Sequence, residues 1–214
     1  MTLPAKPFAL SLSPTNLVVA MAGRLVHIYA ASALSLLASQ SAQDPPNAIT
    51  AEPLQRRESS LKFLTRALAC MPSDAGFACS SIEGRVAVDW FDGSAEAQAR
   101  KYAFKCHRQP APDDAATDVV HPVHALAFHP RYGTFVSGGG DGVVALWDAA
   151  AKRRIRQYQR FPTSVAAMSF NGDGKMLAVA VSPGFEDARD EVGEGPVGVY
   201  VREIGDEAKG RADK

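Results

Sequence analysis

The side chains best suited to recognition chemistry are arginines and carboxylates that fall beside predicted strand ends. Residues 55–108 read as a four-stranded antiparallel unit, in which the chain reverses direction at every turn. In such a unit the turn between the second and third strands and the connection that leaves the fourth strand emerge at the same edge. Six residues are therefore predicted to share one edge of two successive units: Arg66, Glu83, Arg85, Arg108, Asp141 and Arg160.

Converging arginines suit a carboxylate-bearing peptide, because a guanidinium group binds a carboxylate in a planar, two-pronged way. The residues leave a second interpretation open, in which each arginine pairs with an acidic neighbour such as Glu83 or Asp89. Ion pairs of that kind are common on protein surfaces and indicate no ligand.

Catalytic and metal-binding patterns are missing from the sequence. Four histidines repeat no zinc spacing, and the acidic residues between 186 and 194 lack the glycine and spacing of an EF-hand. The glycine run 138–140 has no Gly-Lys-Ser/Thr after it, so we interpret it as turn chemistry. A small hydrolase using Asp141 or the acidic loop is the enzymatic alternative, but no paired catalytic geometry supports it. We predict no enzyme activity, no cofactor and no metal.

Composition excludes several other classes of protein. The 23 basic residues balance 23 acidic ones, which argues against a general nucleic-acid or membrane-surface binder and against direct DNA binding. Cys70, Cys79 and Cys106 match neither a zinc pattern nor a disulfide framework, so we expect reduced thiols. No signal peptide is apparent, and the apolar run near residues 30–38 is too short for a membrane span.

The elements that would position the arginines recur along the chain. The segments 8–14, 66–72 and 124–130 share an Ala-Leu step and a closing proline, and 165–171 is a fourth, looser copy. With several strands in each period and a Trp-Asp at 147–148, this pattern is typical of propeller blades. The predicted fold class is an all-β, WD40-type propeller.

The predicted boundaries follow from the repeat. Blades are expected near 7–61, 62–108, 119–160 and 163–204, the first with its outer strand at 54–61. In the second blade the strand patterns fall at 62–71, 75–81, 85–91 and 102–107. Residues 39–53 are predicted to be a flexible insertion, 183–195 an acidic loop and 205–214 a disordered tail.

Six stretches closely resemble one known family. They are QRRESSLKFLTR, SSIEGRVAVDWFD, KYAFKCHR, HPVHALAFHP, TFVSGGGDGVVALWD and RFPTSVAAMSFNGDGKMLAVAVS. Together they are similar to the mitotic spindle-checkpoint WD-repeat proteins, the non-kinase propeller subunit of the budding-uninhibited-by-benzimidazole family. A sister family, the WD-repeat mRNA-export factors that dock on a nucleoporin, shares EGRVA. QRRESSLK and RFPTSVA favour the checkpoint family.

The resemblance implies a seven-bladed propeller, of which this chain matches about four C-terminal blades. Four blades laid out with seven-blade geometry leave two apolar faces and a strand edge unpaired, so we expect an open, aggregation-prone arc. One interpretation is a truncated gene-model fragment without function. The other is a short protein that closes its arc by self-association.

The resemblance also implies function. The family scaffolds checkpoint signalling in the nucleus, at kinetochores and in the cytoplasm. Its rim binds a short Glu-rich motif of checkpoint kinases or pseudokinases, which we carry over to Arg66 and Arg108 first and then to Arg85. Further implied partners are phosphorylated kinetochore scaffold repeats and the anaphase-promoting-complex activator complex. The alternative function is mRNA export through a nucleoporin.

Overall fold

The computed structural model describes residues 1–43, 50–114, 116–184 and 195–210. Its main elements are four antiparallel sheets in which the order of the strands in space follows their order in the chain. Short turns produce most of this meander, because each brings the chain straight back beside the strand that it has just left. The strand patterns predicted for the second unit, 62–71, 75–81, 85–91 and 102–107, each contain one of its observed strands.

The bounds of the strands are as follows. The first sheet holds β1 (Pro7–Leu12), β2 (Asn16–Met21), β3 (Leu25–Ala30) and β4 (Gln55–Glu58). The second holds β5 (Thr65–Cys70), β6 (Gly76–Ser81), β7 (Arg85–Trp90) and β8 (Tyr102–Lys105). The third holds β11 (Val123–Phe128), β12 (Thr134–Gly139), β13 (Val144–Asp148) and β14 (Arg153–Gln157). The fourth holds β15 (Val165–Phe170), β16 (Met176–Val181) and β17 (Gly198–Glu203).

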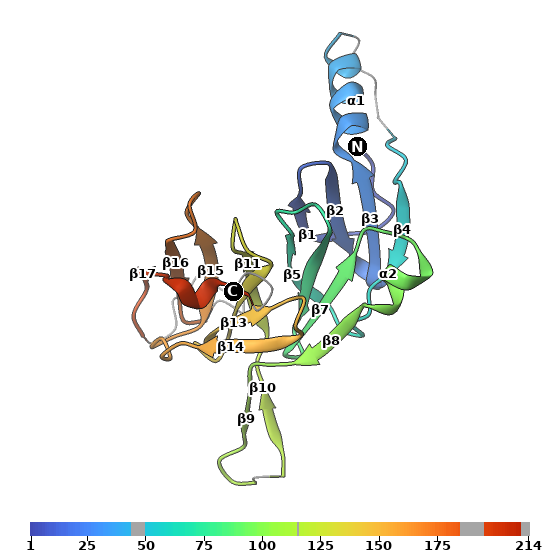
Figure 1. Ribbon diagram of the computed structural model, residues 1–214. Helices are drawn as coiled ribbons and strands as arrows, with labels where there is room; N and C mark the ends of the chain where they lie inside the picture. The colour runs from blue at the N-terminus through green and yellow to red at the C-terminus, as the bar shows by residue number, and fades with distance from the viewer. Residues whose placement is uncertain (44–49, 115, 185–194, 211–214) are drawn as a thin grey trace.

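The sheets stand side by side in an open arc (Figure 1). Their inner strands pack in series, β1 against β5, β5 against β11, and β11 against β15. In the described part of the chain the fourth sheet has three strands instead of four. This is an all-β, WD40-type propeller that is not closed into a ring.

The hydrophobic core lies between successive sheets. Phe135 of β12 is fully buried between the second and third sheets, with its ring 5.1 Å from that of Phe128. Val136, the next residue, points to the other face of the same sheet and packs against the fourth sheet. A sheet in this fold is therefore apolar on both faces.

Two of the hairpin turns depend on glycine. Gly84 joins β6 to β7 with φ +63°, and Gly142 joins β12 to β13 with φ +71°. A Cβ atom at Gly84 would lie 2.6 Å from the carbonyl oxygen of Cys106, and one at Gly142 would lie 2.7 Å from that of Phe161. Only glycine tolerates both the backbone angle and this close approach.

Two predicted mobile segments contain ordered structure. Residues 39–43 belong to helix α1 (Ala31–Gln43), whose Ala, Leu, Ser and Gln residues are compatible with a helix, and Ala51 is buried. In the tail a 3-10 helix, η3 (Asp206–Ala208), is held in place by the hydroxyl of Thr134, which donates to the Ala208 carbonyl at 2.7 Å. These elements lie within the segments predicted to be flexible (39–53) and disordered (205–214), and the mobility of both segments stays a prediction.

Other parts of these predictions fall outside the described ranges. Most of the acidic loop 183–195 does so, as do residues 44–49 and 211–214. Three short elements were not predicted: the 3-10 helix η1 (Ala22–Arg24), the helix α2 (Ala95–Ala99) and a two-stranded ribbon of β9 (Arg108–Pro110) and β10 (Asp118–Val120). The ribbon projects from one end of the sheets (Figure 1). No helix in the described ranges is long and apolar enough to cross a lipid bilayer.

Truncating Phe135 tests this account of the core. We expect Phe135→Ala to lower the free energy of unfolding by about 4 kcal/mol, because it removes buried apolar surface and leaves a cavity. Phe63→Ala is the matched control, since Phe63 is 54% exposed and its loss should change stability by no more than about 0.5 kcal/mol. Urea unfolding followed by fluorescence measures both. Equal midpoints for the two variants would contradict the placement of Phe135.

Candidate functional site

The six predicted site residues lie at one end of the second and third sheets, and we call them the arginine rim: Arg66, Glu83, Arg85, Arg108, Asp141 and Arg160. Arg66 is the second residue of β5, and Glu83 and Arg85 flank the glycine of the β6–β7 turn. Arg108 follows β8, while Asp141 and Arg160 hold the corresponding places around β12–β13 and after β14.

The same contact recurs in both sheets. The guanidinium of Arg108 donates to the Glu83 carbonyl at 2.9 Å, and that of Arg160 donates to the Asp141 carbonyl at 2.6 Å. In each case an arginine beyond the outer strand holds the turn between the middle strands. The contact uses one N–H group, and a guanidinium has five. The Nε atom of Arg108 is buried and has no hydrogen-bond partner among the described residues.

Arg66 and Arg85 are arranged differently. Arg66 lies on the inner strand, where its Nε is 3.0 Å from Nδ1 of His124, on the inner strand of the next sheet. Arg85 Nε is 3.6 Å from the Glu83 carboxylate, an ion pair within the sheet of the kind that the second interpretation describes. Asp89, the other acidic neighbour considered, pairs instead with Arg57 and Lys101.

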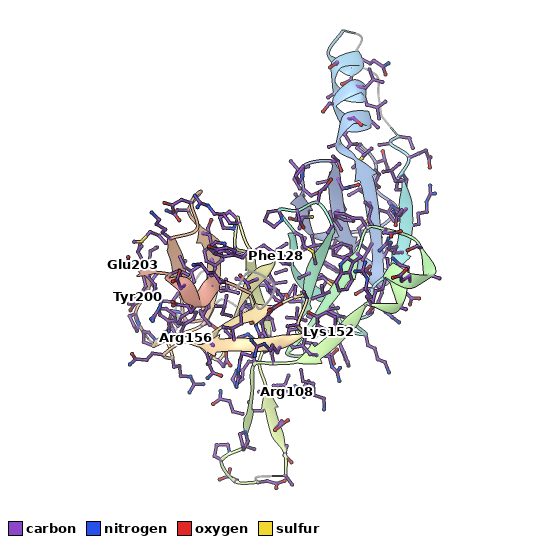
Figure 2. The ribbon with its side chains drawn as sticks, in the orientation of Figure 1. Arg108, Phe128, Lys152, Arg156, Tyr200 and Glu203 are labelled. Carbon is purple, nitrogen blue, oxygen red and sulfur yellow. The ribbon has the colours of Figure 1, made fainter. Side chains whose placement is uncertain are left out.

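A cavity of about 400 Å³ opens between the second and third sheets beside the outer arginines. Four cationic side chains line it: Lys105, Arg108, Arg154 and Arg160. Figure 2 shows Arg108 where the β9–β10 ribbon leaves the sheets. Lys105 and Arg154 were missed by sequence reasoning, because an exposed outer strand gives no signal of which neighbour it faces. The cavity suits an anionic ligand.

Asp141 has a structural task as well. Its carboxylate accepts from His107 Nδ1 at 2.8 Å, and Nε2 of that histidine is 2.8 Å from Ser137 Oγ. Trp147 Nε1 donates to the same hydroxyl at 2.9 Å. All four side chains are buried. Burial alone would raise the pKa of Asp141, but the hydrogen bond and charge of His107 hold that pKa below its usual value.

The network ties the rim to the core. His107 directly precedes Arg108 in the chain, so the contacts that hold the His107 ring against β12 also position the backbone of Arg108. The backbone of His107 has φ +50°, an uncommon angle that the buried ring contacts stabilise. Sequence reasoning did not connect His107 with Ser137 or Trp147.

Ser137, His107 and Asp141 have the hydrogen-bond order of a catalytic triad. Ser137 is fully buried, however, and its hydroxyl already receives the hydrogen bond from Trp147. A nucleophile must reach the substrate, so this arrangement is structural. Among the described residues, no group of three or more His, Cys, Asp or Glu side chains is placed to hold a metal ion.

Removing the histidine tests the network. We expect His107→Ala to cost about 3 kcal/mol of unfolding free energy, because Asp141 then keeps a buried charge without its partner. His121→Ala is the control, since His121 is only half-buried and its ring hydrogen-bonds the side chain of Gln109 at 3.0 Å, away from Ser137 and Trp147. Chemical denaturation of both variants measures the difference. A His107→Ala protein as stable as the control would show that the network does not hold the rim.

The comparisons with known proteins agree with this architecture. The family model of the WD domain, G-beta repeat, matches residues 116–148. Mitotic checkpoint protein BUB3.1 of Arabidopsis thaliana is 46% identical over 201 residues, which are 94% of this chain and 53% of that protein. Mitotic checkpoint protein bub-3 of Caenorhabditis elegans is 51% identical over 65% of this chain and 40% of its own length.

More distant likenesses extend the comparison. The mRNA export factor GLE2 of Chaetomium thermophilum is 40% identical over 58% of this chain and 34% of that protein. Two solved structures share the fold. The computationally designed Ika4 protein superimposes with a TM-score of 0.59 at 16% sequence identity, over 96% of this chain and 95% of that one. The Cps50 (Swd1) propeller domain of Myceliophteria thermophila superimposes with a TM-score of 0.57 at 15% sequence identity, over 91% of this chain and 57% of that one.

The chain spans about half the length of the curated relatives that it matches. The WD repeat, the meander sheets packed in series and the identity to checkpoint proteins lead to one conclusion: the chain is a WD40-type propeller that is similar to the BUB3 mitotic checkpoint proteins.

Proposed function

We propose that this chain is a non-catalytic scaffold of the mitotic spindle checkpoint whose arginine rim binds a short, glutamate-rich segment of a checkpoint kinase or pseudokinase. The observation that carries the proposal is the repeated contact of Arg108 with Glu83 and of Arg160 with Asp141. Each contact fixes a guanidinium group in place while leaving N–H groups for a ligand. A guanidinium group that is already held in position loses little conformational entropy when a carboxylate binds to it.

The position of each rim residue suggests its role. Arg66, on the inner strand, would meet the part of a peptide that crosses the centre of the arc, together with Arg85 and Glu83 in the turn. Arg108 and Arg160 would meet carboxylates further out. Asp141 would contribute through its backbone carbonyl and through His107, because its carboxylate is already used within the core.

The cationic cavity supports a second class of ligand at the same end. A phosphorylated segment, such as a phosphorylated kinetochore scaffold repeat, carries three strong acceptor oxygens and a charge between −1.5 and −2. Lys105, Arg108 and Arg154 would surround it. The anaphase-promoting-complex activator complex is a further proposed partner, and the proposed location is the nucleus and the kinetochore, with a cytoplasmic pool.

Charge reversal on the rim tests the proposal. We expect Arg66→Glu and Arg108→Glu each to weaken binding of a peptide with paired glutamates by about tenfold or more, because each loses a charge-assisted hydrogen bond and gains repulsion. Arg108→Lys should weaken binding less, since lysine keeps the positive charge although it lacks the planar, two-pronged donor geometry of arginine. Isothermal titration calorimetry measures the affinities.

Arg131→Glu serves as the control. Arg131 is exposed and lies in the β11–β12 turn, at the opposite end of the sheets, so this variant should bind the peptide as the unchanged protein does. Thermal melting of every variant separates lost binding from lost folding. Folded Arg66→Glu and Arg108→Glu proteins that bind with unchanged affinity would exclude the rim as the docking site.

A role in mRNA export is the second candidate, favoured by the 40% identity to an export factor. Both roles would use a propeller rim to hold a peptide, so the partners decide between them. We expect affinity purification of the tagged chain from mitotic cells to enrich kinetochore proteins, with purification by the Arg108→Glu variant as the control. Enrichment of nucleoporins instead, lost in the same variant, would favour mRNA export.

A further inference from the structure

Two serines of this chain are followed directly by proline, at Ser13-Pro14 and at Ser182-Pro183. A serine-proline step is the sequence that proline-directed protein kinases modify. Proline has no backbone N–H group, so a kinase cleft without an acceptor at that position accepts proline and disfavours residues whose N–H would be left unsatisfied. The proline also keeps the preceding serine extended, which suits such a cleft. The sequence therefore offers two candidate acceptors, and their surroundings decide between them.

Ser13 is unsuited to modification. It is 6% exposed, in the turn between β1 and β2. Its hydroxyl donates to the Asp74 carboxylate and accepts from the backbone N–H of Asn16 at 3.1 Å. A kinase would have to break both hydrogen bonds, and the phosphate would be left against a carboxylate of like charge. Ser13 therefore serves as the internal comparison.

Ser182 directly follows β16 and is half-buried, as is Pro183. Its hydroxyl donates to the carbonyl of Pro183 at 3.2 Å, a contact between adjacent residues that ties the side chain to no other part of the fold. The end of a strand opens locally at small cost in free energy, which lets the segment enter a kinase cleft. Of the two serine-proline steps, this is the one whose hydroxyl a kinase can reach.

The position of Ser182 is repeated in the other sheets. Its backbone N–H donates to the carbonyl of Ser164, the residue before β15, at 3.0 Å. Ile82 and Gly140 make the equivalent contact in the second and third sheets, at 3.2 Å and 2.9 Å. Those two residues directly precede the two acidic residues of the arginine rim. Ser182 is therefore the counterpart, in the fourth sheet, of residues that adjoin the rim.

A short series of contacts connects Ser182 with an arginine of the rim. The hydroxyl of Ser164 donates to the Gly140 carbonyl at 3.2 Å. The carbonyl of the next residue, Asp141, accepts from Arg160 Nε at 2.6 Å. A phosphate on Ser182 would carry a charge between −1.5 and −2 to this end of the junction between the third and fourth sheets. It would lower the positive potential of this part of the rim.

We propose that Ser182 is a phosphorylation site for a proline-directed kinase, and that its phosphate weakens the binding of an acidic peptide to the arginine rim. The second part rests on the proposed function of the rim. In the transfer, Ser182 Oγ attacks the γ-phosphorus of ATP held by the kinase, the bond to ADP breaks, and the serine proton passes to a base of the kinase. The phosphoserine then repels the glutamate carboxylates of the peptide.

Treating the full 214-residue chain with a mitogen-activated protein kinase and ATP tests the site. Mass spectrometry of the folded chain should show one added phosphate, and peptide mapping should place it on Ser182. Ser182→Ala should stay unmodified, whereas Ser13→Ala should be modified like the unchanged chain. Phosphate on Ser13 instead, or a folded chain that gains no phosphate at Ser182, would overturn the site.

Calorimetry with the paired-glutamate peptide tests the effect. We expect the phosphorylated chain to bind about fivefold more weakly, as for one added surface charge interaction. The difference should shrink in 1 M salt, where the Debye length falls to about 3 Å. Ser182→Ala, shown by thermal melting to be folded, should bind like the unmodified chain even after kinase treatment.

Two outcomes separate the effect from the proposed function. Unchanged affinity after complete phosphorylation of Ser182 would overturn the effect while leaving the rim as the docking site. If the unmodified chain does not bind the peptide, the proposed function and the effect fall together, and mass spectrometry still decides whether Ser182 is the acceptor.

Discussion

The constraint on which this structure depends is that each sheet is apolar on both faces. Val136 and Phe135 are neighbours in β12 and point in opposite directions, yet both are fully buried, because a sheet lies on either side. A strand that alternates between two buried faces has few positions for polar side chains. The chemistry of the molecule is therefore confined to the ends of the strands and to the outer strands, which is where its arginines stand.

The second constraint is electrostatic. The buried carboxylate of Asp141 requires a partner, and His107 supplies it from a strand connection 34 residues away. This contact orders a backbone with a positive φ angle and determines where Arg108 leaves the core. The proposed binding and the stability of the fold would thus be coupled at the rim, because Asp141 holds His107 through its carboxylate and Arg160 through its backbone carbonyl.

The proposed function depends on how rigidly the arginine side chains of the rim are held. Two guanidinium groups are held by backbone carbonyls, and a cationic cavity lies beside them. We propose that this pre-ordered cationic rim binds extended acidic or phosphorylated segments, which would need little rearrangement of the protein. At the two ends of the arc, apolar side chains such as Leu10 and Val199 are exposed to water, which is unfavourable because apolar surface is stabilised by burial.

The sequence by itself determined the propeller class, the turns at Gly84 and Gly142, and the gathering of six residues at one end, because alternation and turn chemistry are local properties of the chain. Only the tertiary structure decided how those residues are used. Arg85 pairs with Glu83, Asp141 turns its carboxylate inward to His107, and Lys105 joins the cavity. It also decided that the segment around Ala208 is packed, through a contact with Thr134 that lies 74 residues away. Contacts between distant segments depend on how the sheets stack, and no local pattern in the sequence encodes that.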